Sequence, residues 1–500
     1  MLTLRAEQVR DAWRINHVRR GFFGTVLITI GSFTPAYLPQ ASPFWPAMRA
    51  LKLDNPVAEI IGTGLVLAGV ALLVSAWFRL RPWGDDRMVE AYRHVRHWAV
   101  LIIWGGPFVL APPIFSHDAY SYAAQGWLVH NGINPYEQGP GVLPGGFADQ
   151  VAWVWRFTPA PYGPLSLQLQ HFLVDLVGHD PYISAVVMRV PALVGVALIG
   201  ALLPRLAARM KIDPASAAWF ATLNPVLVID FIGGAHNDAL MMGLVVLALW
   251  LTRIVGWGWV PGAVIIGVAA AIKQPALLAA YALPLVHRPW RRLELGETLD
   301  IIARAMAAMT LAIGTFAGVS WLTGLGFGWL NAVNVPGLVV TVSPFTVIGQ
   351  ALSWVFDVVG WQSGAEGAVR WSRSVGLLTS VAIVGTLAVT VARRRPMTFL
   401  SYSYLAVAIC APALHSWYVL WGGLLLPLAK PSPKAIRVAV WATVVLLSYA
   451  AINLAFRNGA LSLGVAAIGL YFWQSRTEDL KAQRRHRRAA RQREKQRNAP

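Results

Sequence analysis

Apolar runs of about 15 to 22 residues recur along the whole 500-residue chain and constrain its fold more than any other feature. Only 13% of the residues are charged, whereas soluble domains carry about 25%. Runs of this length can cross a bilayer as helices, which satisfy their backbone hydrogen bonds internally. We therefore expect an all-α polytopic membrane protein rather than a set of soluble domains.

The Lys and Arg residues between these runs predict how the chain is oriented, because cytoplasmic loops are enriched in them. We predict a cytoplasmic N-terminus over 1–20, a membrane domain over 21–475 with about 14 spans, and a basic cytoplasmic tail over 476–500. The apolar piece 345–359 is expected to be interfacial or re-entrant, since a span there would leave the Arg triplet 393–395 outside. The predicted spans are 21–38, 57–78, 98–115, 183–203, 215–232, 239–252, two short spans within 259–288, 302–322, 373–392, two around 415–418, 437–455 and 459–474.

The basic tail contributes +7 of the net charge of +19, with ten Lys and Arg against three Asp and Glu. Such a tail could indicate nucleic-acid binding. A basic segment that follows a membrane helix more simply sets topology and contacts anionic lipid. We expect membrane lipid, and no nucleic acid, as its partner.

The segment 116–181 is the long polar interruption between the early spans and is predicted to be a large extracytoplasmic loop. It holds one basic residue, Arg156, against five acidic ones. Asp118 lies near its start, where a predicted span should leave the bilayer. A carboxylate at the end of a span is costly, so its presence there indicates a functional role. Tyr, Trp and amide side chains follow, a mixture that suits sugar binding but also an interfacial aromatic belt. The apolar stretch 165–177 is expected to form a short interfacial helix.

The other unusual polar clusters fall on the same predicted side of the membrane as Asp118. They are His236-Asn237-Asp238, Lys273-Gln274 and His415. Each has a structural alternative, because Asn237 or Asp238 can cap the following helix and His415 can cap another. Together, however, polar groups at span ends on one face can line one cavity. This convergence predicts an extracytoplasmic active site.

Arg189 lies about two turns inside a predicted span. It could extend to the interface or pair with a carboxylate. It could equally meet a lipid phosphate in the cavity.

Several other classes of site have no signature in the chain. There is no P-loop and no dinucleotide fingerprint, so nucleotide-driven chemistry is not expected. The His and acidic residues do not form HExxH or another metal signature, and no metal is expected. The single cysteine, Cys410, lies in an apolar run and is expected to be a small buried side chain.

Five segments together resemble a known family. They are SHDAYSYAAQG…GINPYEQGP (116–140), PYGPL (161–165), GGAHNDALMMGL (233–244), AIKQPALL (271–278) and HSWYVLW (415–421). They are similar to the polyprenol-phosphomannose-dependent α-1,6-mannosyltransferases, membrane glycosyltransferases of the GT-C architecture that extend the lipomannan and lipoarabinomannan backbone. The resemblance covers about residues 21–475.

The resemblance implies a lipid-linked donor, polyprenyl phosphomannose, and an α-1,6-mannoside lipoglycan acceptor, with no other cofactor. GT-C enzymes carry a catalytic acidic residue at the start of the first large extracytoplasmic loop, which is the place of Asp118. We expect Asp118 to act as general base in a single inverting displacement. The expected substrate-binding residues are His117, Tyr122, Gln125, Asn134, Tyr136, Arg189, His236, Asn237, Asp238, Lys273, His415 and Trp417.

Two other functions stay open from the sequence. One is a GT-C transferase of another polyprenyl-phosphate sugar, such as arabinofuranose. The other is a lipid-linked sugar transporter or flippase, which should show ionisable residues near mid-membrane and two repeated halves. The polar clusters sit mainly at one face, and no internal repeat is evident, which favours the transferase.

Overall fold

The computed structural model describes residues 2–39, 41–82, 95–287, 294–331 and 342–456, with the single positions 462, 464 and 469. These residues form helices and connecting turns, with no strand among them. The all-α prediction is therefore confirmed for the part of the chain that is described. The predicted span 459–474, apart from those single positions, and the predicted tail 476–500 lie outside the described residues.

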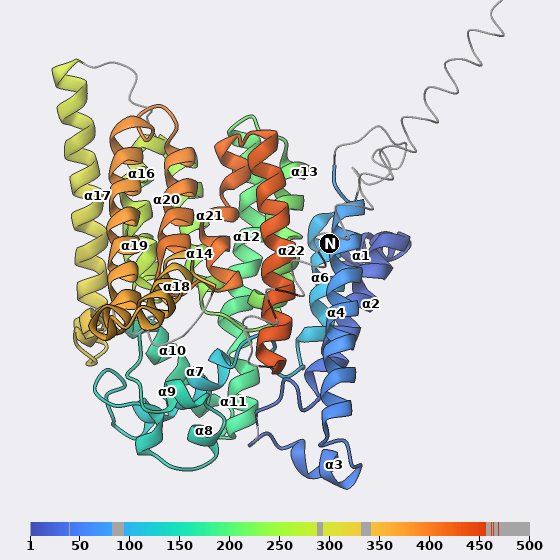
Figure 1. The fold of residues 1–500 in the computed structure, drawn as a ribbon. Coiled ribbons are helices and arrows are strands. Elements are labelled where there is room, and N and C mark those ends of the chain that lie inside the picture. Colours follow the sequence, from blue (N-terminus) through green and yellow to red (C-terminus); the bar gives the residue numbers. More distant parts are fainter. Residues whose placement is uncertain are drawn as a thin grey trace, which may run out of the picture.

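The long helices stand side by side as one bundle (Figure 1). The first half of the chain supplies α1 (Leu2–Trp13), α2 (Asn16–Ser32), α3 (Trp45–Ala50), α4 (Pro56–Arg79), α6 (His97–Gly105), η1 (Gly106–Phe108), α7 (Asp118–His130), η2 (Pro140–Val142), α8 (Gly146–Asp149), α9 (Trp153–Arg156), α10 (Pro164–Leu176), α11 (Pro181–Val187), α12 (Arg189–Arg209), α13 (Pro214–Ala217), η3 (Ala218–Thr222) and η4 (Leu227–Gly233). The second half supplies α14 (Asp238–Ile254), α15 (Trp259–Ala270), η5 (Gln274–Leu277), α16 (Leu278–His287), α17 (Leu295–Leu322), α18 (Pro344–Val358), α19 (Gln362–Thr390), α20 (Pro396–Cys410), η7 (Ser416–Tyr418), α21 (Val419–Gly423), η8 (Leu426–Ala429) and α22 (Pro433–Phe456).

Five helices among the described residues are long and apolar enough to cross a membrane, and a bent pair makes a possible sixth. They are Pro56–Arg79, Pro181–Arg209, Leu295–Leu322, Gln362–Thr390 and Pro433–Phe456, with Pro214–Thr222 and Leu227–Gly233 as the bent pair. Shorter apolar helices occupy other predicted spans, including Trp259–Ala270 and Pro396–Cys410. The predicted sequence of apolar segments thus folds into helices, several of them shorter than a full span.

The predicted span 98–115 is wrong in its second half. Helix α6 ends at Gly105, and a single 3₁₀ turn follows it. Pro107, Pro112 and Pro113 explain this early end, because proline cannot donate to the helix ladder and its ring clashes with the preceding turn.

The segment 116–181 is far more helical than a loop. It contains α7, three short helices and α10, which confirms the predicted helix at 165–177 almost to the residue. In Figure 1 these elements gather at one end of the bundle with α3 and α11, while α13 and the C-terminal end of α12 lie at the other. The polar segment and the basic end of α12, with Arg205 and Arg209, therefore lie on opposite sides of the bundle.

Helix α18 occupies the apolar piece 345–359 and has 15 residues. It lies across the end of the bundle on the same side as α7 to α10 (Figure 1). This placement matches the expectation of an interfacial element rather than a span.

Candidate active site

Asp118 is the first residue of α7. Its backbone N–H donates to Oγ of Ser116 at 3.0 Å, and Phe115 just before adopts a left-handed φ of 65°. Strained backbone of this kind is costly for a bulky residue and is concentrated at functional sites. His117 points elsewhere, because its Nε2 lies 2.9 Å from the carbonyl of Tyr37. The adjacent His117 and Asp118 therefore do not act as one pair.

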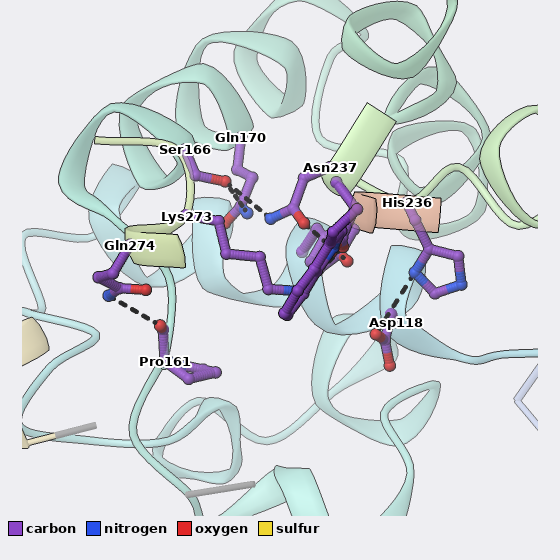
Figure 2. A network of polar contacts seen from close by, with 11 residues as sticks. Asp118, Pro161, Ser166, Gln170, His236, Asn237, Lys273 and Gln274 are labelled. Carbon is purple, nitrogen blue, oxygen red and sulfur yellow. Dashed lines mark hydrogen bonds and ion pairs between the residues drawn. The ribbon is translucent and has the colours of Figure 1, made fainter. Parts of the chain in front are cut away.

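The Asp118 carboxylate faces His236, which comes from a turn more than a hundred residues further on (Figure 2). Oδ2 of Asp118 lies 3.6 Å from Nδ1 of His236, and the Asp118 side chain keeps 20% exposure while His236 has none. Ala235, just before His236, adopts a left-handed φ of 58° that turns the ring inward. Burial raises the pKa of Asp118 to about 6, so the carboxylate is mainly ionised at pH 7 yet can still take a proton.

The ring of His236 is stacked on Trp417 at 3.6 Å between centroids, and His415 stacks on the same indole at 4.4 Å. Burial and the charge of Lys273 hold the pKa of His236 well below its usual range. The same two causes lower the pKa of His415 to about 3. Both imidazoles are therefore neutral, and they can offer hydrogen bonds but no positive charge to a substrate.

Asp238 and Lys273 form a buried ion pair beside this group. Nζ of Lys273 donates to both carboxylate oxygens, at 2.9 and 2.8 Å, and the indole N–H of Trp421 donates at 2.7 Å. Asp238 is fully buried, and the Lys273 side chain is 12% exposed. Lys273 also lies 4.7 Å from the ring centroid of Tyr418. Asp238 is thus committed to its partners, whereas the carboxylate of Asp118 is still reachable from solvent.

Asn237 links the cluster to α7 and α10. Its amide donates to Oγ of Ser166 at 3.2 Å, and its oxygen accepts from the hydroxyl of Tyr122 at 3.4 Å (Figure 2). Its side chain makes no capping hydrogen bond to α14. The capping alternative for Asn237 therefore does not describe its contacts.

The segments PYGPL and AIKQP are joined backbone to backbone. The N–H groups of Gly163 and Leu165 donate to the carbonyls of Ile272 and Ala271 at 3.0 and 2.9 Å. A Cβ on Gly163 would lie 2.2 Å from the Ala271 carbonyl oxygen, so only glycine allows this approach. Gln274 adds a hydrogen bond to the Pro161 carbonyl at 3.2 Å (Figure 2). This junction fixes Lys273 against α7 and α10.

Of three other predicted residues, Asn134 and Tyr136 make structural hydrogen bonds, and Gln125 keeps an acceptor without a partner among the described residues. Asn134 accepts from the backbone of Tyr136 at 3.1 Å and donates to Glu137 within its own turn. Tyr136 is buried, and its hydroxyl donates to the Tyr162 carbonyl at 2.8 Å. Gln125 is buried on α7, and its Oε1 has no hydrogen-bond partner among the described residues. Asn134 and Tyr136 thus hold the segment together, while Gln125 keeps an acceptor to offer.

Arg189 is a correction to the sequence-based expectation. It is 2% exposed, and its guanidinium donates to the backbone carbonyls of Ile232, Val109, Ala111 and Gly233 at 2.7 to 3.0 Å. Carbonyl oxygens left free by the irregular backbone around η1 and η4 take up its donors. We therefore assign Arg189 to the scaffold and no longer to a lipid phosphate or a carboxylate partner.

Asp230 was overlooked in the sequence. It lies in the π-helical turn η4 and is fully buried, with the hydroxyl of Ser416 as its hydrogen-bonding neighbour. Ser416 comes from the turn η7, which packs against η4. π-Helical turns recur at functional sites. The available signal was an acidic residue inside an otherwise apolar predicted span.

Comparison with known proteins identifies the chain. Residues 18–288 match the family described as alpha-(1->6)-mannopyranosyltransferase, N-terminal domain, and residues 345–472 match the MptB C-terminal domain. The chain belongs to the alpha-(1->6)-mannopyranosyltransferase family. No solved structure matches it significantly.

The curated relatives in this family come from mycobacteria and corynebacteria. Alpha-(1->6)-mannopyranosyltransferase A of Mycobacterium tuberculosis is 31% identical over 83% of this chain and 80% of its own length. A probable alpha-(1->6)-mannopyranosyltransferase of Mycolicibacterium smegmatis is 29% identical over 84% and 80%. Alpha-(1->6)-mannopyranosyltransferase A of Corynebacterium glutamicum is 27% identical over 84% and 89%.

The residues of the polar cluster come from both matched domains of this mannosyltransferase family. Asp118, His236, Asp238 and Lys273 lie in the N-terminal match. The aromatic residues around them, His415, Trp417 and Trp421, lie in the C-terminal match. Neither domain alone contains the whole cluster.

Proposed function

We propose that this mannosyltransferase moves mannose from polyprenyl phosphomannose to the 6-hydroxyl of an α-1,6-mannan acceptor, extending a lipomannan backbone. Family membership supports mannosyl transfer. The observation that carries the site is that three clusters distant in sequence, 236–238, 273–274 and 415–421, meet one another and Asp118. The carboxylate of Asp118 is partly exposed and can react, while the buried Asp238–Lys273 ion pair beside it holds the site in place.

Asp118 is the proposed general base. The acceptor O6–H proton passes to a carboxylate oxygen of Asp118 while O6 attacks C1 of the mannosyl group. The bond from C1 to the phosphate oxygen breaks, and polyprenyl phosphate leaves with the bonding electrons. A β-linked donor then gives an α-linked product in one inverting step, and no covalent nucleophile is required. The raised pKa of Asp118 suits this task, because a base is most effective near the operating pH.

Lys273 is the proposed partner of the departing phosphate. It is the cation of the cluster with a partly exposed side chain, and Asp238 and the neighbouring rings hold it in place. A fixed positive charge stabilises growing negative charge without reorganisation. His236 and His415 can assist as neutral hydrogen-bond donors, and Tyr122, Gln125, Asn237 and Trp417 as contacts for the sugars.

The lipid part of the donor fits an apolar cavity of about 370 Å³ between α20, α21 and α22. Leu405, Ile409 and Val438 are among the residues that line it. Its lining also includes Val419 and Leu420, the chain neighbours of the Tyr418 and Trp421 rings that surround Lys273. We assign the polyprenyl chain to this cavity, with its phosphate toward Lys273.

The membrane arrangement completes the proposal. Arg205 and Arg209 at the end of α12 mark the cytoplasmic side by the positive-inside rule. Helices α7 to α10 lie at the opposite end, so the site faces the extracytoplasmic side of a bacterial plasma membrane (Figure 1). We retain about 14 spans, with the shorter apolar helices as partial or tilted spans.

The test uses membranes that contain the full chain, a short α-1,6-mannoside, and either radiolabelled polyprenyl phosphomannose or polyprenyl phosphoarabinose. We expect labelled mannoside product in a new α-1,6 linkage from the first donor only. Transfer from the arabinose donor alone would support the other transferase. Movement of intact donor across the bilayer without any product would support a flippase.

A further inference from the structure

A second cluster of titratable side chains lies at the far end of α7, away from Asp118. His130, the last residue of α7, and His171, Asp175 and His179, on and just after α10, converge on one carboxylate. Nδ1 of His130 lies 2.8 Å and Nε2 of His179 lies 3.2 Å from Oδ1 of Asp175, and Nε2 of His171 lies 3.1 Å from Oδ2. We propose that this cluster binds a divalent transition-metal ion, with Zn²⁺ as the best match.

The donor set is the first argument. Three imidazoles and one carboxylate are the nitrogen and oxygen ligands that zinc takes in four-coordinate sites. Imidazole-rich sites also suit Ni²⁺, Cu²⁺ and Co²⁺, whereas Mg²⁺ and Ca²⁺ prefer all-oxygen sites. The class of ion therefore follows from the residues.

The spacing of the donors is the second argument. Ligand atoms of His130, His171 and Asp175 all lie within 4.8 Å of one another. Tetrahedral zinc with bonds of about 2.0–2.1 Å holds its ligand atoms about 3.3 Å apart. The three nitrogen-to-oxygen distances, 2.8 to 3.2 Å, lie within about half an ångström of that separation. His130, His171 and Asp175 form the compact part of the site, and His179 is the ligand that must turn toward it.

The hydrogen bonding of His171 is the third argument. The amide nitrogen of Gln168 donates to the Thr323 carbonyl at 2.9 Å, which leaves its Oε1 as an acceptor 3.4 Å from Nδ1 of His171. This contact favours the proton on Nδ1. With Nδ1 carrying the proton, Nε2 is the ring nitrogen left to bind a cation placed between it and the Asp175 carboxylate, 3.1 Å away. An outer hydrogen bond on the other ring nitrogen is the usual support of a metal-bound histidine.

The site is accessible from solvent. The three imidazoles are 30% to 39% exposed and Asp175 is 42% exposed. A bound ion would tie the C-terminal end of α7 to α10 and to the turn after it, on a helix whose first residue is Asp118.

The experiment titrates the full chain, purified in detergent through a tag without histidine, with Co²⁺ and then with Zn²⁺ as competitor. We expect one saturable equivalent, a visible Co²⁺ spectrum of low coordination number that Zn²⁺ abolishes, and a Zn²⁺-dependent rise in melting temperature. His171→Ala, His179→Gln and Asp175→Asn should each weaken binding by at least the 10–100-fold that loss of an outer-shell contact costs. His17→Ala, at the opposite end of the molecule, is the matched control and should bind like the wild type.

Three results would overturn the proposal. They are no saturable binding by the wild type, unchanged binding in the three cluster variants, or an equal loss in the His17→Ala control. The metal-free melting temperature of each variant shows whether it is folded. His179 lies beyond the end of α10, and glutamine at this position can still donate to Asp175. His179→Gln therefore still tests the proposal if His171→Ala unfolds.

Discussion

Helix α7 carries two polar clusters, one at each end, that differ in almost every respect. At its first residue, Asp118 meets a buried group in which Asp238 and Lys273 neutralise each other and two imidazoles are neutral. At its last residue, His130 joins an exposed group in which one carboxylate meets three imidazoles. Burial thus shifts the pKa values in the Asp118 cluster, while the His130 cluster remains open to solvent.

The difference shows what each cluster can do. In the buried cluster, Asp238 and Lys273 are paired with each other, and Asp118 keeps a partly exposed carboxylate with a raised pKa. Such a carboxylate is suited to accepting a proton from a substrate. An exposed set of converging ligands has no such tuning, and is suited to capturing an ion. The predictions below separate these roles.

The largest expected effect comes from breaking the buried pair. Lys273→Met leaves the Asp238 charge uncompensated and should lower the free energy of unfolding by roughly 3–5 kcal/mol. The double variant Asp238→Asn/Lys273→Met should recover much of that loss, because both charges are gone. Unfolding in detergent measures both, and a single variant as stable as the double one would contradict the pairing.

Arg189 should show a purely structural effect. Arg189→Gln leaves several buried carbonyls without donors, each at a cost of about 1–3 kcal/mol. We expect lower stability with an unchanged KM for the donor in the folded fraction. A variant of wild-type stability whose donor KM rises strongly would return Arg189 to the phosphate site.

The pH dependence of turnover should follow Asp118. Its pKa is raised to about 6, and the base must be ionised, so kcat/KM should fall about tenfold per pH unit below that value. The contribution of Asp118 to folding stability has the opposite pH dependence from its contribution to turnover. A carboxyl with a raised pKa in the folded state stabilises the fold at low pH and loses that contribution as pH rises through about 6. A flat rate profile between pH 5 and 7 would contradict this assignment.

The smallest effect on turnover is expected at the exposed cluster. Asp175→Asn in metal-free protein should change kcat by less than about threefold, since it lies at the opposite end of α7 from the base. A loss comparable to that of an active-site variant would show that the two ends are coupled. The same variant is the matched control for Asp118→Asn, because both replace an Asp on the α7–α10 segment.

The sequence predicted the all-α class and the grouping of Asp118, His236, Asp238 and Lys273, because charge asymmetry sorts span ends by side without any knowledge of distance. It could not show that Asp238 and Lys273 neutralise each other, since pairing depends on how η5 packs against α14. It also did not predict that Arg189 binds backbone carbonyls, because no sequence pattern shows which carbonyls an irregular turn leaves without a donor.

The metal candidate was missed for a different reason. His171, Asp175 and His179 are spaced four apart, which places the first two on one helix face, but this pattern is common and matches no catalytic zinc signature. The ligand from α7, His130, becomes visible only when α7 and α10 pack together. Asp230 was detectable as an acid inside an apolar run.

A single-turnover assay of Asp118→Asn tests the central claim most directly. Enzyme preloaded with radiolabelled polyprenyl phosphomannose is mixed with a short α-1,6-mannoside, and bound donor and product are counted. Asparagine keeps the size and hydrogen-bonding ability of aspartate but cannot accept the acceptor's proton. We predict wild-type donor binding with transfer slowed about 10²–10⁴-fold, against near-normal transfer by Asp175→Asn. Transfer at the wild-type rate by Asp118→Asn would contradict the account and remove Asp118 from the chemistry.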